Sequence, residues 1–283
     1  MRFFNRKSGS VPDRKSRSVP ICVFCHHKAG TVLLSTVFRQ ICAANNWKYE
    51  SLKGKRARVR PNADVTLFPH SLVDPAHIAE PFVGIHIIRD PRDIIVSGYL
   101  YHRRTTEKWC INTDFSMTPP IRYPTVPHSQ EHRSREWKMG YLKSLSGQSY
   151  QENLLQMSPE RGLMFEMNNY GAWTIERMKQ WDYRPGNILE ITFEGLMSDY
   201  DHTFRMIFEH MRFSGSERAV ALKIAAQHDI GRKSPKEIEK TPHVSSPRTT
   251  KWKEYFGARL RKAFLDKFAG ILVDLGYETS NRW

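Results

Sequence analysis

Residues 21–31 read Ile-Cys-Val-Phe-Cys-His-His-Lys-Ala-Gly-Thr and carry the clearest structural pattern in the chain. The apolar run Ile21–Cys25 is typical of a buried strand, and residues 26–30 then form a tight glycine turn. From Thr31 to Ala44 the apolar residues lie on one stripe of a helix, which consists of Leu33, Leu34, Val37, Phe38 and Ile41. A strand that runs through a tight loop into a helix is the opening unit of an α/β fold.

Three further strands are predicted, at Val65–Phe68, Gly84–Ile88 and Ile188–Phe193. Asp90 is expected to cap the helix after the second of these, with Pro91 in its first position. Helical patterns occur near residues 91–102, 131–144, 160–181, 195–211, 216–227 and 253–275. Because strands alternate with helices, the sequence predicts one α/β domain over residues 20–283, with a central, mostly parallel sheet flanked by helices.

The excess of positive charge lies in three short segments. The 283 residues carry a formal net charge of +15. Residues 1–19, 53–60 and 232–253 hold this excess, and the rest of the chain is balanced. Residues 1–19 are interpreted as a flexible basic arm, and the other two segments could face an anionic ligand. No nucleic-acid-binding module is recognisable, so nucleic acid is not the expected partner.

The sequence has no apolar run near the roughly 18 residues that a membrane span needs. Its basic start is followed by polar residues and not by an apolar signal region. We therefore expect a cytoplasmic protein without membrane insertion, and a short transit peptide is the alternative. The sequence makes no prediction of oligomeric state.

Cys22 and Cys25 form a C-x-x-C pair, a spacing that also occurs in redox and zinc sites. Here the pair lies within a predicted strand, where a separation of three places the two side chains on opposite faces. No second C-x-x-C is present to complete a tetrahedral site. Buried, reduced thiols are the expected state.

Two segments carry patterns that suit an anionic ligand. The turn before Thr31 opens a helix, and a helix N-terminus favours a phosphate, with Lys28 as an adjacent cation. The Walker A pattern is absent, because the lysine precedes the glycine. In the second segment, Arg89 lies between a strand and a helix, at the sheet edge where open α/β folds bind ligands, and Ser97 follows two helical turns later. An arginine fork can bind two phosphate oxygens.

Together these segments resemble the sulfotransferase family that uses 3'-phosphoadenosine-5'-phosphosulfate (PAPS). Lys28, Gly30 and Thr31 match the family's 5'-phosphosulfate loop, P-K-[ST]-G-T-[TS]-W-L. The family's 3'-phosphate motif, R-[DN]-P-[RK]-D-x-x-x-S, is matched by Arg89, Pro91, Arg92, Asp93 and Ser97. The resemblance implies a sulfotransferase architecture related to that of P-loop NTPases, with PAPS as donor, adenosine 3',5'-bisphosphate (PAP) as product and no metal.

The resemblance also implies the residues that bind the donor, including Phe193 against the adenine and Arg248 on the 3'-phosphate. They are Lys28, Ala29, Gly30, Thr31, Val32, Arg89, Ser97, Phe193, Arg248 and Trp252. The chain departs from the family pattern at several positions. Val32 replaces a hydroxyl residue and Leu33 replaces a tryptophan, while the late motif keeps Trp252 without its glycines. One hydrogen bond to the phosphosulfate is therefore expected to be missing.

The resemblance implies a catalytic base as well. His70 follows the predicted strand Val65–Phe68, where many family members carry a catalytic histidine, and His27 is a weaker candidate. In the expected reaction, an acceptor hydroxyl or amine attacks sulfur in line and passes its proton to His70. Lys28 then stabilises the charge that develops on the leaving oxygen.

Two other functions remain open. A P-loop kinase-like phosphoryl transferase would share the strand–loop–helix phosphate site but should carry a magnesium-binding carboxylate, and no convincing pair is present. A non-catalytic module that binds polyanions is supported only by the basic segments at 53–60 and 232–253.

The acceptor is expected to be a small molecule, with a glycan as the alternative. Residues 105–130 and the helix near 131–144 are predicted to form its pocket, although a surface or core position is the simpler interpretation of each residue there. The candidates to contact a ring or a cation are Trp109, Tyr123, Trp137, Glu107, Asp114 and Glu131.

Overall fold

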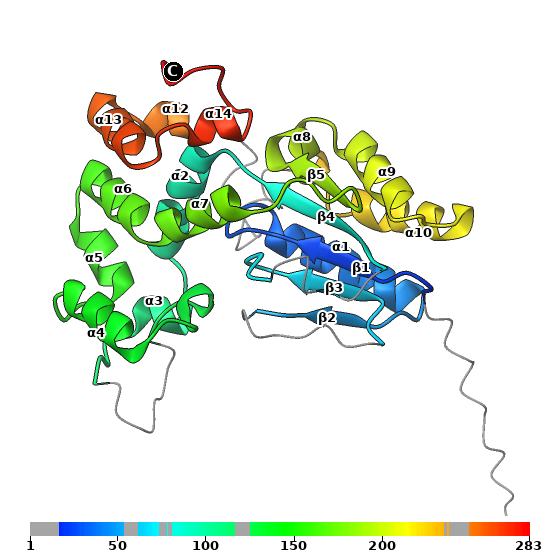
Figure 1. Ribbon diagram of the computed structural model, residues 1–283, viewed down its shortest axis with the longest axis horizontal. Coiled ribbons are helices and arrows are strands. Elements are labelled where there is room, and N and C mark those ends of the chain that lie inside the picture. Colours follow the sequence, from blue (N-terminus) through cyan, green and yellow to red (C-terminus); the bar gives the residue numbers. More distant parts are fainter. Residues whose placement is uncertain are drawn as a thin grey trace, which may run out of the picture.

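The computed structural model describes residues 17–53, 62–73, 78, 81–116, 125–234, 237 and 249–283. Its centre is a five-stranded sheet of order β2-β3-β1-β4-β5 in which every paired strand is parallel (Figure 1). The strands are β1 (Ile21–Phe24), β2 (Tyr49–Ser51), β3 (Val65–Phe68), β4 (Val83–Ile88) and β5 (Ile188–Thr192). The predicted α/β class is confirmed.

Helices follow β1, β4 and β5, as the alternating pattern predicts. The α-helices are α1 (Thr31–Ala44), α2 (Pro91–His102), α3 (Lys108–Ile111), α4 (Arg135–Ser144), α5 (Tyr150–Gln156), α6 (Pro159–Asn168), α7 (Tyr170–Gln180), α8 (Phe193–Ser198), α9 (Tyr200–His210), α10 (Gly215–Ala226), α12 (Trp252–Tyr255), α13 (Ala258–Lys267) and α14 (Ile271–Asp274). The short 3-10 helices are η2 (His128–Gln130) and η3 (Ile230–Arg232). The predicted ranges of α1 and α2 are confirmed.

The two faces of the sheet bury different clusters, because side chains along a strand alternate between faces. Ile21, Val23 and Cys25 join a cluster with α1, α9 and α10, the helices that Figure 1 shows over this face. Cys22 and Phe24 join a smaller aromatic cluster on the other face. The two cysteines of the C-x-x-C pair therefore point apart, and all four cysteines are buried and free, as expected.

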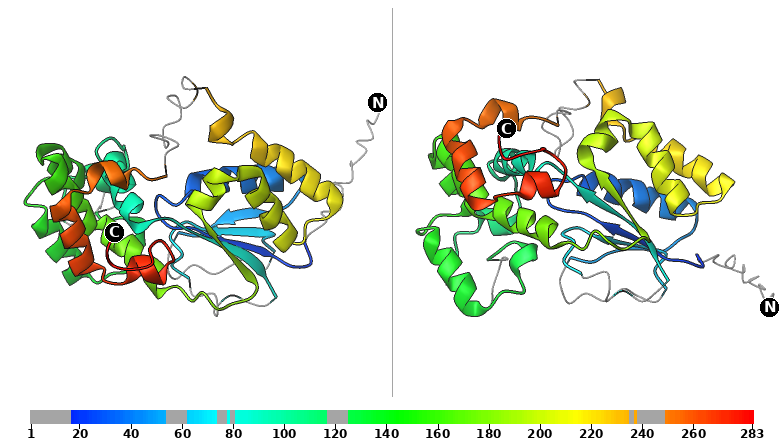
Figure 2. Two further views of the ribbon diagram at one scale, coloured as in Figure 1. Left: turned by 90° about the horizontal axis from the view of Figure 1, so that it is seen from above. Right: turned by 45° about the horizontal axis from the view of Figure 1, so that its top comes forward.

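A second helical body lies beyond the carboxyl ends of the strands (Figure 2). Its core combines side chains from α2 to α7 with others from α12 to α14. The early helix α2 and the C-terminal helices are thus neighbours, although 159 residues separate Asp93 from Trp252. This packing places the helical body next to the sheet edge from which the two motif segments extend.

Several predicted elements are shorter than expected. The helix near 160–181 is two helices, which meet at Asn169 with φ −119° and ψ −105°. The final helix is divided into α12, α13 and α14, and Gly270 between the last two has a φ of 82°. The left-handed backbone of Gly270 cannot be part of a right-handed helix, so at that position the apolar period alone overestimated the helix length. The late strand also ends at Thr192, so that Phe193 begins α8.

Strand β2, the helices α3 and α5 and the short 3-10 helices were not predicted. Strand β2 has only three residues and lies at the sheet edge, where partial burial produces no apolar run. Helix α5 starts at a capping box, in which Ser149 and Glu152 exchange side-chain and backbone hydrogen bonds. That Ser-x-x-Glu spacing was the available sequence signal for α5.

Most residues of the three basic segments lie outside the described residues. Their predicted roles as a flexible arm and as anion-binding runs stay predictions. In the described part of the chain, no helix has the length and apolar character required to cross a membrane.

Candidate functional site

A cavity of about 870 Å³ opens at the carboxyl edge of the sheet. Residues in the segments that follow four different strands line it: Lys28 after β1, His70 after β3, Arg89 after β4 and Phe193 after β5. Parallel strands end together at one edge, which is where open α/β sheets bind ligands. The volume lies in the range of small-molecule and cofactor sites.

The loop after β1 forms a tight turn that opens α1. The amide of Ala29 and the hydroxyl of Thr31 both donate to the carbonyl oxygen of His26, at 3.1 and 3.0 Å. Gly30 is the N-cap, and neither a side-chain cap nor an acidic residue occupies the first turn of α1. The first amides of a helix have no partner within it, so this end is a site for an anion.

Lys28 adopts a left-handed backbone conformation, with a φ of 62°. Its carbonyl oxygen accepts a 2.9 Å hydrogen bond from Nη1 of Arg89, and its Nζ lies 4.0 Å from the centre of the Tyr101 ring. Burial, followed by the charges of Arg89, Arg104 and Lys251, lowers the pKa of Lys28 to about 7, while Glu107 opposes the shift. The lysine is thus held in the cavity with a proton that it can lose near neutral pH.

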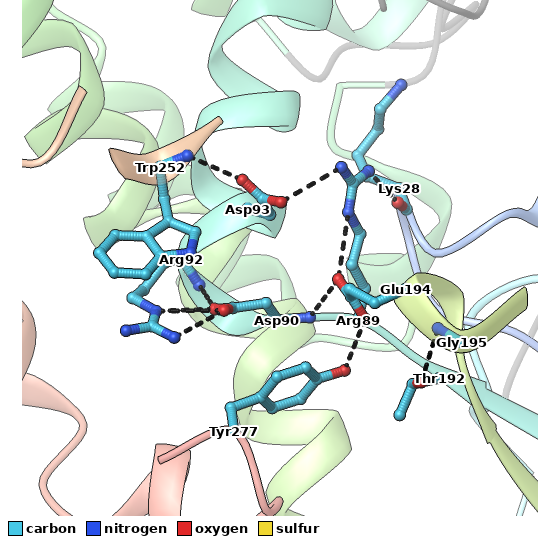
Figure 3. A network of polar contacts seen from close by, with 10 residues as sticks. All are labelled: Lys28, Arg89, Asp90, Arg92, Asp93, Thr192, Glu194, Gly195, Trp252 and Tyr277. Atoms are coloured by element: carbon cyan, nitrogen blue, oxygen red, sulfur yellow. Dashed lines mark hydrogen bonds and ion pairs between the residues drawn. The ribbon is translucent and has the colours of Figure 1, made fainter. Parts of the chain in front are cut away.

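Arg89 is buried between two carboxylates from different elements (Figure 3). Its Nη2 is 3.7 Å from Asp93 of α2, and its Nε is 4.0 Å from Glu194 of α8. Glu194 is itself oriented, because it accepts hydrogen bonds from the Asp90 amide and the Tyr277 hydroxyl. The guanidinium is therefore fixed at the cavity wall, and its pairs with carboxylates are long enough for an anion to compete.

The helix that carries Ser97 begins as predicted. The Asp90 side chain accepts from the amide of Arg92, which confirms the N-cap, and Pro91 occupies the first turn. Ser97 is buried two turns into α2 and lines the cavity together with Arg89. Arg89 and Ser97 of the second motif therefore line the same cavity as Lys28.

The ring of Phe193 packs against both Arg89 and the loop that follows β1. Its ring lies 4.6 Å from the Arg89 guanidinium. A Cβ atom on Gly30 would approach the same ring to 3.2 Å. The glycine is thus needed both for its φ of 88° and for this close packing.

His70 lines the cavity as predicted, just beyond β3. Burial is the main cause that lowers its pKa to about 4, with a further contribution from His128, and Glu107 acts in the opposite direction. A neutral imidazole at neutral pH can accept a proton, so its chemistry suits a general base.

Three of the predicted donor-binding residues are not among the described residues that line the cavity. Trp252 is not among the residues that line the cavity, and its ring packs 3.7 Å from the guanidinium of Arg92. Its backbone amide donates to Asp93, so it joins α12 to α2. The side chain of Ala29 is fully buried, which leaves only its backbone for a ligand. Arg248 lies outside the described residues.

The cavity contains residues that the motifs did not identify. Lys251 lines it, and burial together with the charge of Arg89 lowers the pKa of Lys251 to about 8. The lysine lies within the predicted basic segment 232–253, which was the available signal. The rings of Tyr101 and Tyr170 also line it, and no sequence spacing indicated that they would. Of the predicted acceptor contacts, Glu107 and Trp109 line the cavity, whereas Asp114, Glu131 and Trp137 do not and Tyr123 is outside the described residues.

Solved structures with low sequence identity are similar to this chain. Retinol dehydratase in complex with androsterone and inactive cofactor PAP has a TM-score of 0.50 and 13% identity, over 92% of this chain and 82% of that one. Mouse sulfotransferase SULT7A1 complexed with PAP has a TM-score of 0.46 and 14% identity, over 93% and 88%. Retinol dehydratase with retinol and PAP gives 0.49 and 14%, over 92% and 83%. No family model and no curated protein matches the chain. The predicted sulfotransferase fold is confirmed.

Proposed function

We propose that this protein transfers a sulfuryl group from PAPS to a hydroxyl or amine of a small-molecule acceptor. The observation that carries the proposal is the convergence of Lys28, Arg89, Ser97 and Phe193 on one cavity. They come from three separate segments of the sequence, and the resemblance to PAPS-dependent sulfotransferases implies a donor-binding role for each. The shared fold with a PAP-bound retinol dehydratase supports the same conclusion.

The cavity has the charge and size for a nucleotide with two anionic ends. The open N-terminus of α1 and Lys28 suit the 5'-phosphosulfate, while Arg89 and Ser97 suit the 3'-phosphate. Phe193 offers an aromatic face to the adenine. The hydroxyl of Thr31 already donates to His26, so the amides of the loop would make most contacts with the 5'-phosphate.

In the proposed reaction the acceptor oxygen or nitrogen forms a bond to sulfur as the bond from sulfur to the bridging phosphate oxygen breaks. The acceptor proton passes to His70, and the electron pair leaves on adenosine 3',5'-bisphosphate. Lys28 stabilises the charge that develops on that oxygen. A sulfuryl group carries less negative charge than a phosphoryl group, so we propose that the transfer needs no metal.

The test combines binding and turnover. We expect PAP to bind without metal and more tightly than ATP with Mg²⁺, and labelled PAPS to modify members of a panel of phenols, alcohols and amines. Preferential binding of ATP with Mg²⁺ would instead indicate a phosphoryl transferase. Salt-sensitive polyanion binding without any transfer would indicate a binding module.

His70→Ala is expected to lower kcat by tenfold or more, because the acceptor would lose its general base. The wild-type profile of kcat/KM against pH supplies a second readout. Since the pKa of His70 is lowered to about 4, the base is neutral above that pH, and the acidic limb of the profile should appear only as pH drops towards 4. An acidic limb near the ordinary histidine value of 6.5, or a loss below tenfold in the variant, would contradict the assignment.

Gly30→Ala is expected to destabilise the protein by about 1–2 kcal/mol through its left-handed backbone and to weaken PAP binding severalfold by displacing Phe193. Gly276→Ala is the matched control, because Gly276 also has a positive φ but a Cβ there would have no neighbour within 4 Å. Denaturant unfolding should show a loss in both variants, and PAP titration a loss in Gly30→Ala alone. Equal PAP affinity in the two variants would contradict a role for the packing of Phe193 on Gly30.

A further inference from the structure

We propose that Tyr101 and Glu107 are positioning residues, which hold the ammonium group of Lys28 in the cavity and supply the negative charge that balances its cationic neighbours. The inference deepens the proposed function and rests on it for the role of Lys28. Neither residue belongs to the two motifs, and both come from the end of α2 and the start of α3.

The first contact is between Lys28 and the face of an aromatic ring. Nζ of Lys28 lies 4.0 Å from the centre of the Tyr101 ring, within the distance of a cation–π interaction. The left-handed φ of 62° at Lys28 and the hydrogen bond from Arg89 to its carbonyl fix the backbone from which this side chain extends. The ring therefore lies where it can hold the amine of a side chain that would otherwise have many rotamers.

The second contact fixes the ring. The hydroxyl of Tyr101 donates to Oε1 of Glu107 at 2.7 Å, and Nε1 of Trp109 donates to Oε2. Burial raises the pKa of Tyr101, which keeps the hydroxyl protonated as a donor. Burial also favours the neutral form of Glu107, but the hydrogen bonds from Tyr101 and Trp109 outweigh it and lower the pKa of Glu107. The carboxylate is therefore charged at neutral pH and held at both oxygens.

Glu107 is an unusual group in this cavity. It is the only acidic side chain among the described residues that line it, and no ion pair between described residues includes it. A partly buried carboxylate without an ion-pair partner has an energetic cost, so its position needs a compensating charge nearby. Tyr101 contacts Lys28 through its ring and Glu107 through its hydroxyl, so Lys28 is the cation that can supply this charge.

The charges around Lys28 explain why this position matters. Arg89 at the end of β4, Arg104 after α2 and Lys251 before α12 all disfavour its protonated form, as burial does. His27, its chain neighbour, has a pKa that is itself lowered, so it adds little positive charge. Glu107 is the group that favours the protonated form. Without it, Lys28 would be neutral over more of the physiological range, and a neutral amine cannot stabilise the charge on a leaving phosphate.

The test measures the protonation of Lys28 directly, without a ligand or an assay of transfer. Competitive labelling with acetic anhydride, read by mass spectrometry across pH, gives the pH at which Lys28 is half reactive. We expect this pH near 7 in the wild type. In Glu107→Gln it should be lower by about one pH unit, because an opposite charge nearby has been removed.

Two further variants separate the ring from the carboxylate. Tyr101→Phe keeps the aromatic face but loses the bond to Glu107, so the half-reactive pH should fall by less than in Glu107→Gln. Tyr101→Leu removes the ring, and the labelling rate of Lys28 at high pH should rise as the amine becomes mobile. Glu160→Gln is the matched control, since Glu160 lies on the surface 3.5 Å from Arg259, and it should leave the Lys28 profile unchanged.

A Lys28 profile in Glu107→Gln that overlays the wild-type profile would overturn the proposal. If that variant does not fold, as judged by circular dichroism, Tyr101→Phe carries the test, and an unchanged profile there would overturn it equally. Failure of the proposed function has a different signature, which is an absence of PAP binding and sulfuryl transfer while the Lys28 profiles still shift. Where transfer occurs, Glu107→Gln should lower kcat more than it changes KM, with the loss largest at alkaline pH.

Discussion

Replacing Lys28 with methionine is expected to lower kcat for sulfuryl transfer by about 100- to 1,000-fold, the usual effect of removing one group that stabilises transition-state charge. Methionine has nearly the same length and no charge, and the backbone of the loop would be unchanged. The amine matters most as the bond to the leaving oxygen breaks, so the effect on KM should be smaller than the effect on kcat. Initial rates with labelled PAPS at saturating acceptor measure both.

Lys262→Met is the matched control for this loss. Lys262 is an exposed lysine on α13 that pairs with Asp266 at 2.7 Å, so the same chemical change there should leave turnover at the wild-type level. The thermal unfolding of Lys28→Met should stay close to wild type, because the variant loses the contact with the Tyr101 ring but also loses the desolvation cost of the buried amine. A Lys28→Met enzyme with nearly wild-type kcat would contradict the catalytic role assigned to Lys28.

Replacing Arg89 with methionine should affect binding and stability together. PAP affinity is expected to fall by at least about 100-fold, since a guanidinium that can bind two phosphate oxygens is lost. The fold is also expected to lose about 3–5 kcal/mol, because the buried Asp93 and the partly buried Glu194 would remain without their common cation. Isothermal titration with PAP and denaturant unfolding measure the two effects.

The stability loss in Arg89→Met should depend on pH. Burial already raises the pKa of Asp93 to about 6 and raises that of Glu194, with Arg89 acting against both shifts. A carboxyl whose pKa is raised in the folded state costs stability once pH exceeds its unfolded value, and protonation removes that cost. The difference in unfolding free energy from wild type should therefore be smaller at pH 5 than at pH 8.

A surface arginine offers the control for Arg89. Arg184 pairs with Asp182 at 2.8 Å and is almost fully exposed, so Arg184→Met should change stability by less than about 1 kcal/mol. Its PAP affinity should equal that of the wild type. Loss of PAP binding in the control, or full affinity in Arg89→Met, would contradict the role given to Arg89.

The sequence predicted the local elements of the site well where short-range chemistry specifies them. The apolar run at β1, the stripe along α1 and the cap at Asp90 each involve residues close in the chain, and the structure confirms them. The late helices were predicted less well. Their apolar period continues past Lys267, where α13 ends, and through Gly270, whose left-handed backbone precedes α14.

The sequence also placed Lys28, Arg89 and His70 after strand ends and Ser97 two helical turns beyond Arg89, and parallel strands necessarily finish at one edge of a sheet. Their common cavity follows from that topology. In contrast, the position of Trp252 under Arg92 depends on packing between α2 and the C-terminal helices, and no local pattern encodes it.

Local sequence was therefore sufficient for the strand–loop–helix unit around Lys28, the α/β class and the edge of the sheet where a ligand would bind. The surroundings of Lys28 required the folded structure. The ring of Tyr101, the carboxylate of Glu107 and the amine of Lys251 reach it from elements 73, 79 and 223 positions away in the sequence. Charge and desolvation act through space, so the groups that set the protonation of Lys28 are known only once the chain has folded.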